Sequence, residues 1–207
     1  MFLETIVVGP LQVNCYLVGC EQSREAAVID PGDEVERILD QLQRHGYRPT
    51  LIINTHEHFD HVSGNQALHS ASGASIVTHP MAAAEITQIS SRALLWGMRA
   101  EDSPPPDRTV TEGDEIQIGE SITLKVLETP GHSLGSITLV GDGAAFVGDL
   151  IFAGSIGRTD FPGGDYDTLI GAVREKIFPL GDEVVLYSGH GPATTVGRER
   201  ATNPFFV

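Results

Sequence analysis

Four apolar segments that lie far apart in the sequence each end in a side chain able to bind a metal. The segment "LIINT" leads into His56, "KVLETPG" into His132, "AAFVG" into Asp149 and "VVLYSG" into His190. Ligand sites in α/β proteins lie beyond the carboxyl ends of strands, so segments distant in sequence can meet there. The sequence therefore predicts an α/β fold whose strands bring these side chains to one pocket.

The alternation of strand and helix patterns predicts layered sheets with helices outside. Two helices are expected, over 33–46 with Asp33 as N-cap and Gly46 as the stop, and over 165–178 with Asp165 as N-cap. The two halves of the chain are broadly similar, joined by a loop around 99–115, so we expect one domain over residues 1–207. Nine apolar runs have strand character: 5–8, 15–18, 26–29, 51–53, 75–77, 122–126, 136–140, 144–147 and 184–187.

The charge of the chain argues against polyanionic partners. Asp and Glu number 28 against 13 Lys and Arg, which gives a net charge of -15. Nucleic acid and anionic membranes would be repelled, so we expect neither as a partner. Glu4, Gly9 and Pro10 interrupt the first apolar run, which fits neither a signal peptide nor a membrane span. A cytoplasmic location is expected, with Cys15 and Cys20 as packing residues; the oligomeric state is not predicted.

The stretch "THEHFDH" places four polar donors in seven positions. His56, His58, Asp60 and His61 would cost several kcal/mol if they were buried together without a partner. A metal site is therefore favoured over a purely structural cluster. Three other histidines stand alone and are expected to be structural: His45, His69 and His79.

The spacing of the donors indicates the kind of site. His56 and His58 are two residues apart, which suits an extended or looped backbone and not the helical motif of two histidines four apart. Two cations close together lower the pKa of a shared water to about 7 and stabilise an oxyanion, so hydrolysis is the expected chemistry. The donors suffice for two divalent ions, zinc or iron with manganese as a third option: His56, His58 and His132 on one, Asp60, His61 and His190 on the other, and Asp149 between them.

Four motifs in this order resemble the metallo-β-lactamase superfamily: "THEHFDH", "TPGHSLGS", "VGDLIF" and "SGHGP". The resemblance covers essentially the whole chain. It implies an αββα sandwich of two mixed β-sheets with helices on the outer faces, and it assigns the seven donors above as metal ligands. In "VIDPGD", which also resembles the superfamily, Asp30 either orients a ligand histidine or serves the turn before a helix.

Within the superfamily the chain most resembles the glyoxalase II group, the hydroxyacylglutathione hydrolases, in their compact bacterial form. "GSIGRTDFPGGD" (154–165) and "GRERATNPFF" (197–206) carry this likeness. Lactam-hydrolysing members commonly have a cysteine ligand and lack the Asp-His pair, whereas this chain has Asp60 and His61, so lactam hydrolysis is disfavoured. Neither the length nor the charge supports an RNA-processing member.

Arg158 is the residue expected to bind an anionic group of the substrate. Full-length glyoxalase II enzymes carry a helical C-terminal domain with basic residues, but here seventeen residues follow His190. The guanidinium of Arg158 offers a bidentate fork close after Asp149. Asp160 either contacts the substrate as well or holds Arg158 in an ion pair.

The resemblance implies hydrolysis of a small-molecule thioester. A hydroxide shared by the two metals would attack the carbonyl, and Asp60 would bind the second metal and orient the hydroxide. An oxidoreductase is the alternative. "GRTDF" also resembles persulfide dioxygenases of the same superfamily, which bind one iron through residues matching His56, His132 and Asp149.

Overall fold

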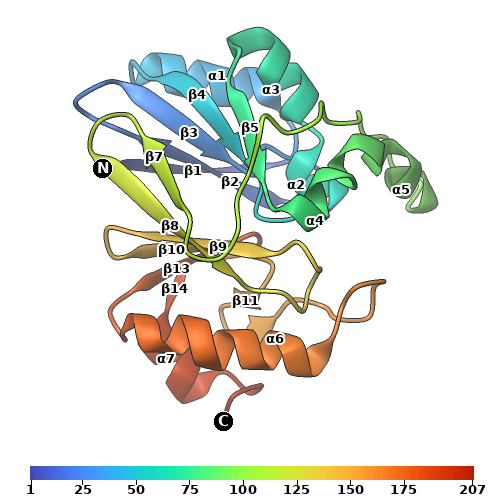
Figure 1. Ribbon diagram of the computed structural model, residues 1–207, viewed down its shortest axis with the longest axis vertical. Helices are drawn as coiled ribbons and strands as arrows, with labels where there is room; N and C mark the ends of the chain where they lie inside the picture. Colours follow the sequence, from blue (N-terminus) through green and yellow to red (C-terminus); the bar gives the residue numbers. More distant parts are fainter.

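Two six-stranded sheets lie face to face in the computed structural model, which describes residues 1–207 (Figure 1). The first sheet has the order β1-β2-β3-β4-β5-β6 and the second β14-β13-β10-β9-β8-β7. Each sheet mixes parallel and antiparallel neighbours, since β3 to β6 run parallel in the first and β10 and β13 in the second. Helices cover the outer faces, and the expected αββα sandwich is confirmed.

All nine expected strands are present. The strands are β1 (Phe2–Val8), β2 (Val13–Gly19), β3 (Glu25–Ile29), β4 (Arg48–Ile53), β5 (Ser75–Thr78), β6 (Arg108–Thr109), β7 (Glu115–Ile118), β8 (Ile122–Glu128), β9 (Ile137–Gly141), β10 (Ala144–Gly148), β11 (Ile151–Phe152), β12 (Ser155–Ile156), β13 (Val185–Ser188) and β14 (Thr194–Thr195). The helices are α1 (Val35–Arg44), α2 (Phe59–Val62), α3 (Asn65–Ser72), α4 (Pro80–Ala83), α5 (Ile89–Leu95), α6 (Tyr166–Ala172) and α7 (Val196–Thr202). None of the helices is both long enough and apolar enough to span a bilayer.

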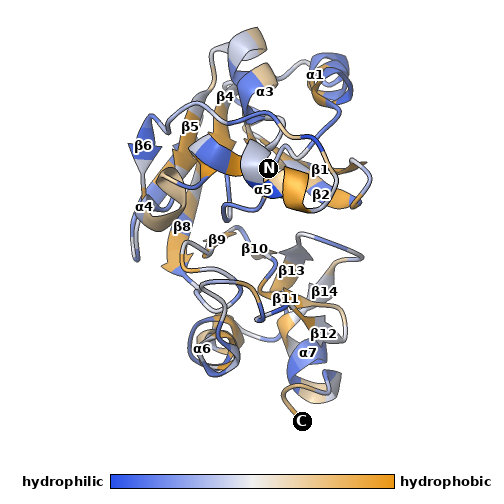
Figure 2. Cartoon of the chain, turned by 90° about the vertical axis from the view of Figure 1, so that its right-hand side faces the viewer, coloured by the Kyte–Doolittle hydropathy of each residue, from blue (hydrophilic) through white to orange (hydrophobic).

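Three apolar clusters fill the spaces between the four layers. Alternate residues of β2 show how one strand serves two of them: Tyr16 and Val18 face the second sheet, while Cys15 and Leu17 face α1 and α3. The third cluster packs α6 and α7 against the outer face of the second sheet. In Figure 2 the interior strands are coloured mainly as hydrophobic, whereas α1 is largely hydrophilic on its outer side. Burial of these three clusters is the main term that holds the layers together.

The two expected helix starts differ in outcome. Asp165 caps α6 as expected, because its Oδ1 accepts from the Thr168 N–H at 2.8 Å. The expectation for Asp33 was wrong. The cap of α1 is Glu34, in the left-handed region at φ 51°, and Asp33 accepts the Glu34 N–H at 2.7 Å, one residue too early to cap the helix. The expected end of α1 at Gly46 is confirmed, since Gly46 follows the helix in the left-handed conformation at φ 71°.

Candidate metal centre

The loop after β4 presents the donors of "THEHFDH". Residues 54–58 are irregular, as the spacing predicted, and α2 begins at Phe59, directly after His58 in extended conformation. His61 therefore projects from a short helix, whereas His56 and His58 project from the loop. The parallel strands β10 and β13 end at the same edge of the second sheet, which brings Asp149 and His190 together, and His132 lies in the loop after β8.

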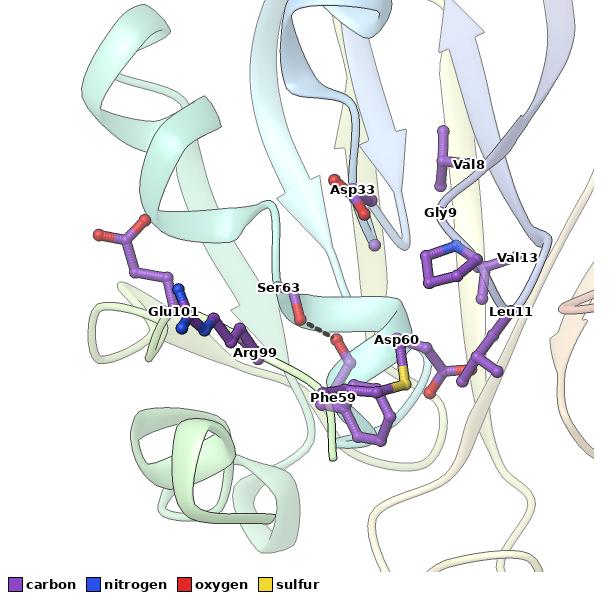
Figure 3. A pocket seen from close by; sticks show the side chains of 14 residues that line it. Val8, Gly9, Leu11, Val13, Asp33, Phe59, Asp60, Ser63, Arg99 and Glu101 are labelled. Atoms are coloured by element: carbon purple, nitrogen blue, oxygen red, sulfur yellow. Dashed lines mark hydrogen bonds between the residues drawn. The ribbon is translucent and has the colours of Figure 1, made fainter. Parts of the chain in front are cut away.

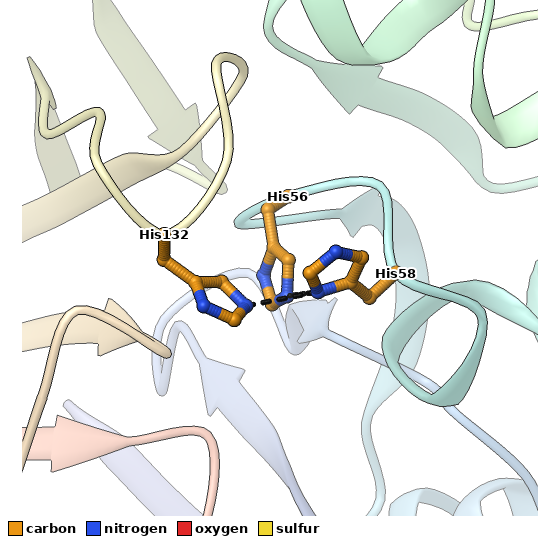
Figure 4. Close-up of side chains that lie close together, drawn as sticks. All are labelled: His56, His58 and His132. Atoms are coloured by element: carbon orange, nitrogen blue, oxygen red, sulfur yellow. Dashed lines mark hydrogen bonds between the residues drawn. The ribbon is translucent and has the colours of Figure 1, made fainter. Parts of the chain in front are cut away.

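Three imidazoles form the first donor group (Figure 4). The Nδ1 atom of His58 lies 3.1 Å from the Nε2 atom of His56 and 2.9 Å from the Nε2 atom of His132. Nitrogen ligands at about 2.05 Å from a tetrahedral zinc ion are roughly 3.3 Å apart, so the observed spacing is close to that of a metal site. His58 offers its Nδ1 atom to this group and the other two offer Nε2.

Asp60, His61 and His190 form the second donor group, and Asp149 lies between the two. The Asp60 Oδ2 atom is 3.4 Å from His190 Nε2 and 3.8 Å from His61 Nε2. Asp149 Oδ2 is 3.7 Å from His132 Nε2 in the first group and 3.5 Å from His190 Nε2 in the second. The carboxylate of Asp149 can thus reach an ion held by either group.

Two buried polar atoms in this cluster have no hydrogen-bond partner. They are Nε2 of His61 and Oδ1 of Asp149, which lie 3.5 Å apart. An unpaired buried donor or acceptor costs about 1–3 kcal/mol, more for a charged group. A cation between these atoms would satisfy both of them, so the residues present fit a metal ion.

Further hydrogen bonds fix which nitrogen each imidazole turns inward. Asp30 is buried; its Oδ2 atom accepts from His61 Nδ1 at 3.0 Å, and its two oxygens also accept from the side chain and main chain of Thr55. His132 donates from Nδ1 to the carbonyl of Arg158 at 2.8 Å. Both bonds leave Nε2 free to face the cluster, as in metal sites whose ligands are oriented by neighbours. Asp30 also lies in the turn before α1 at φ 53°, so its position is compatible with both of the roles expected of it.

The charges in the cluster also favour a cation. Burial and the neighbouring histidines lower the pKa of His56 well below its usual value and that of His58 to about 3. Burial alone would raise the pKa of Asp149, but His61, His132 and His190 together outweigh this effect and hold the pKa well below the usual range. Neutral imidazole and ionised carboxylate are the forms that bind metals. His61 has a raised pKa because Asp149 and Asp60 outweigh its burial, so positive charge is favoured at this point.

A hollow of about 760 Å³ opens onto the donors. Its lining includes five of the seven donors and seven apolar side chains: Leu11, Phe59, Leu95, Trp96, Met98, Phe161 and Pro162. A second hollow of about 420 Å³ lies between the β1–β2 turn and residues 98–101 (Figure 3). The two hollows share Asp60 and three apolar residues. They therefore adjoin each other at Asp60 and extend from it in two directions.

Arg158 lines the main hollow, but its guanidinium is already bound. Its Nε and Nη2 atoms donate to the two carboxylate oxygens of Asp160, both at 2.7 Å, and the group lies 3.6 Å from the centre of the Phe161 ring. Asp160 is not part of the lining. The ion pair corresponds to one of the two roles expected for Asp160.

The sequence interpretation missed Trp96, which contacts Phe161 across the hollow with ring centres 5.5 Å apart. These residues are 65 positions apart, by their numbers, and no local pattern links them. Trp96 is the single tryptophan of the chain and ends α5, a helix that the apolar periodicity did not reveal.

Comparison with known proteins identifies the family. Residues 8–190 match the model of the metallo-beta-lactamase superfamily. The hydroxyacylglutathione hydrolase GloC of Haemophilus influenzae is 36% identical over 208 residues, 99% of this chain and 98% of that protein. Among solved structures, the BLEG-1 B3 metallo-beta-lactamase has a TM-score of 0.93 at 33% identity, with all of both chains covered. The di-iron-bound form of TTHA1623 has a TM-score of 0.89 at 37% identity, with 98% of this chain and 99% of that chain covered. Since the family match runs from the end of the first strand to the last donor and these relatives match nearly end to end, the chain belongs to the metallo-β-lactamase superfamily.

Proposed function

We propose that the protein hydrolyses a small-molecule thioester of the hydroxyacylglutathione type at a centre of two divalent ions. The observation that carries this proposal is the arrangement of two three-residue donor groups around the buried carboxylate of Asp149. The full-length similarity to GloC supports the thioester as the bond that is cleaved. In this proposal His56, His58 and His132 hold one ion, Asp60, His61 and His190 hold the other, and Asp149 is shared.

The metal ions and the side chains around them have different roles in this proposal. The two ions, which we expect to be zinc or iron with manganese also compatible, supply a water of lowered pKa and positive charge for the developing oxyanion. Asp60 faces the cluster from the start of α2 and orients the attacking water. Asp30 and the Arg158 carbonyl hold His61 and His132 in the geometry that this chemistry needs. A thiol has a pKa of about 8.5, so the thiolate leaves without a general acid.

Asp60→Asn is expected to lower kcat for thioester hydrolysis by about a hundredfold with little change in KM, since it removes one charged ligand and the group that orients the water. Steady-state kinetics on S-lactoylglutathione measures both constants. Asp40→Asn provides the control, because Asp40 lies on the outer helix α1 and pairs only with Arg44. An unchanged kcat in Asp60→Asn would contradict the role given to this residue.

Asp30→Asn is expected to weaken metal binding by about ten- to a hundredfold, because the amide of Asn is a weaker acceptor for His61 Nδ1–H. Competition with a chelator of known affinity measures the change. Thr50→Ala is a control of similar size on neighbouring β4, where the hydroxyl of Thr50 bonds only to the Ala26 carbonyl. Equal metal affinity in Asp30→Asn and the unmodified protein would show that Asp30 serves only the turn.

The experiment that tests the function combines metal content with three assays on freshly purified protein. Cleavage of S-lactoylglutathione with about two metals per chain is the expected result. Oxygen uptake on glutathione persulfide with one iron per chain and no cleavage would make the protein a persulfide dioxygenase instead. Because BLEG-1 is a B3 metallo-beta-lactamase, a β-lactam is the third substrate, and hydrolysis of it alone would overturn the proposal.

A further inference from the structure

The main hollow has an apolar wall next to the donors. We define this wall by Leu95 and Trp96, at the end of α5, and Phe161, from the loop after β12. Leu95 is 85% exposed and Trp96 is 55% exposed. Large apolar side chains that gather in solvent beside a reactive cluster mark a surface that a ligand covers.

The wall begins directly at the metal donors. The Phe161 ring meets the His58 ring edge-on, with centres 5.7 Å apart, and Trp96 continues the surface 5.5 Å beyond Phe161. A group attached to a carbonyl at the donors therefore has Phe161 within reach first and Trp96 next. This order suits an acyl group that carries a ring or a short apolar chain.

The charges around the wall do not suit an anionic group. Two arginines line the same hollow, but Arg158 is paired with Asp160 and Arg92 is paired with Glu85. A carboxylate of a glutathione-type thiol would find no unpaired cation there. An apolar group has no charge to desolvate, so its transfer from water to the wall carries no such free-energy cost.

The second hollow offers a separate binding region for the thiol part of a thioester. The second hollow starts at Asp60 and is lined by charged side chains of both signs, Arg99 together with Asp33 and Glu101 (Figure 3). The thiol can therefore leave the donors in that direction while the acyl group stays on the wall. Two exits of different polarity match a substrate with one apolar and one charged end.

We propose that the apolar wall binds the acyl group of the thioester, so that hydroxyacyl groups with a bulky apolar substituent are preferred to the lactoyl group. This inference rests on the proposed thioester hydrolysis. S-Mandeloylglutathione and S-lactoylglutathione form the deciding pair, because they differ only in a phenyl group in place of a methyl group. We expect kcat/KM to be about tenfold higher for the mandeloyl ester, as burial of part of a phenyl ring predicts.

Leu95→Ala and Trp96→Ala are expected to lower the mandeloyl-to-lactoyl ratio of kcat/KM about threefold and about fivefold, through lost apolar contact. Activity on the lactoyl ester should fall less than activity on the mandeloyl ester, since a methyl group makes less contact with the wall than a phenyl ring does. Leu94→Ala is the matched control. Leu94 precedes Leu95 in α5 and is 67% exposed, but it does not line the hollow. The mandeloyl-to-lactoyl ratio of kcat/KM should therefore not change in Leu94→Ala.

Binding without turnover gives a second readout. Trp96 is the chain's single tryptophan, so its fluorescence reports directly on the wall. S-Benzylglutathione should change this fluorescence at a concentration about tenfold lower than S-methylglutathione does. Both are thioethers, which the enzyme cannot hydrolyse.

Four results would overturn the inference. Equal mandeloyl and lactoyl rates would leave the hydrolase proposal standing but remove the preference. A fall of the ratio in Leu94→Ala as large as in Leu95→Ala would show that the effect is not specific to the wall. Equal fluorescence changes with both thioethers would place the thiol part on the wall. Failure to cleave either ester would reject the hydrolase proposal together with the inference.

Discussion

Asp149→Asn is expected to lower kcat/KM for the thioester by about a thousandfold or more. Asp149 is the one carboxylate within reach of both donor groups, and its Oδ1 atom is buried without a hydrogen-bond partner. Losing its charge removes several kcal/mol of metal and transition-state stabilisation, and each 1.36 kcal/mol is tenfold in rate. Metal content should fall below two per chain, which elemental analysis of the dialysed protein measures.

The control for this change lies at the other end of the same strand. Asp142 is exposed in the Asp-Gly turn before β10, at φ 51°, where asparagine is accepted equally well. Asp142→Asn should therefore keep its activity, metal content and melting temperature. Full activity in Asp149→Asn, with two metals bound, would contradict the shared role of this carboxylate.

The main layers of the fold could be predicted because burial leaves a pattern in the sequence. Strands such as β2 and β10 are buried on both faces and read as continuous apolar runs. The short edge strands β6 and β14 and the helices α2 and α4 carry too few residues to show a period. Their positions depend on the neighbouring strands and on the metal loop, so local sequence does not reveal them.

The donor cluster could be predicted for a different reason. Each donor lies in a loop or short helix that follows the end of a strand, so the sequence order already implied that the side chains meet. The sequence did not predict which imidazole nitrogen faces the cluster. His58 presents Nδ1 and His132 presents Nε2, and this depends on contacts with residues far along the chain. The contact between Trp96 and Phe161 is also purely tertiary. It creates the apolar wall, which no motif indicated.

Gly157→Ala is expected to damage the site without touching a donor. A Cβ atom at Gly157 would lie 1.7 Å from the carbonyl oxygen of Asp149 and 3.2 Å from the Nδ1 atom of His132. The first of these atoms is backbone, so either Asp149 or the segment around Gly157 must move, and this segment includes Arg158, whose carbonyl accepts from His132. A displacement of about 1 Å costs roughly a hundredfold in rate, and the forced overpacking costs about 1–3 kcal/mol of stability. Kinetics and thermal unfolding of the metal-loaded protein measure the two effects.

Gly171→Ala separates this steric effect from a general loss of glycine. Gly171 lies in α6, where an added Cβ meets no atom within 4 Å. Alanine in a helix is favoured over glycine by about 1 kcal/mol, so this variant should unfold at a slightly higher temperature and keep its activity. An added Cβ meets backbone at Gly157, in the loop after β12, and open space at Gly171. If Gly157→Ala proved as active and as stable as Gly171→Ala, the backbone of Asp149 could move without cost, and the close packing of the 149–158 segment would not be what positions the shared carboxylate.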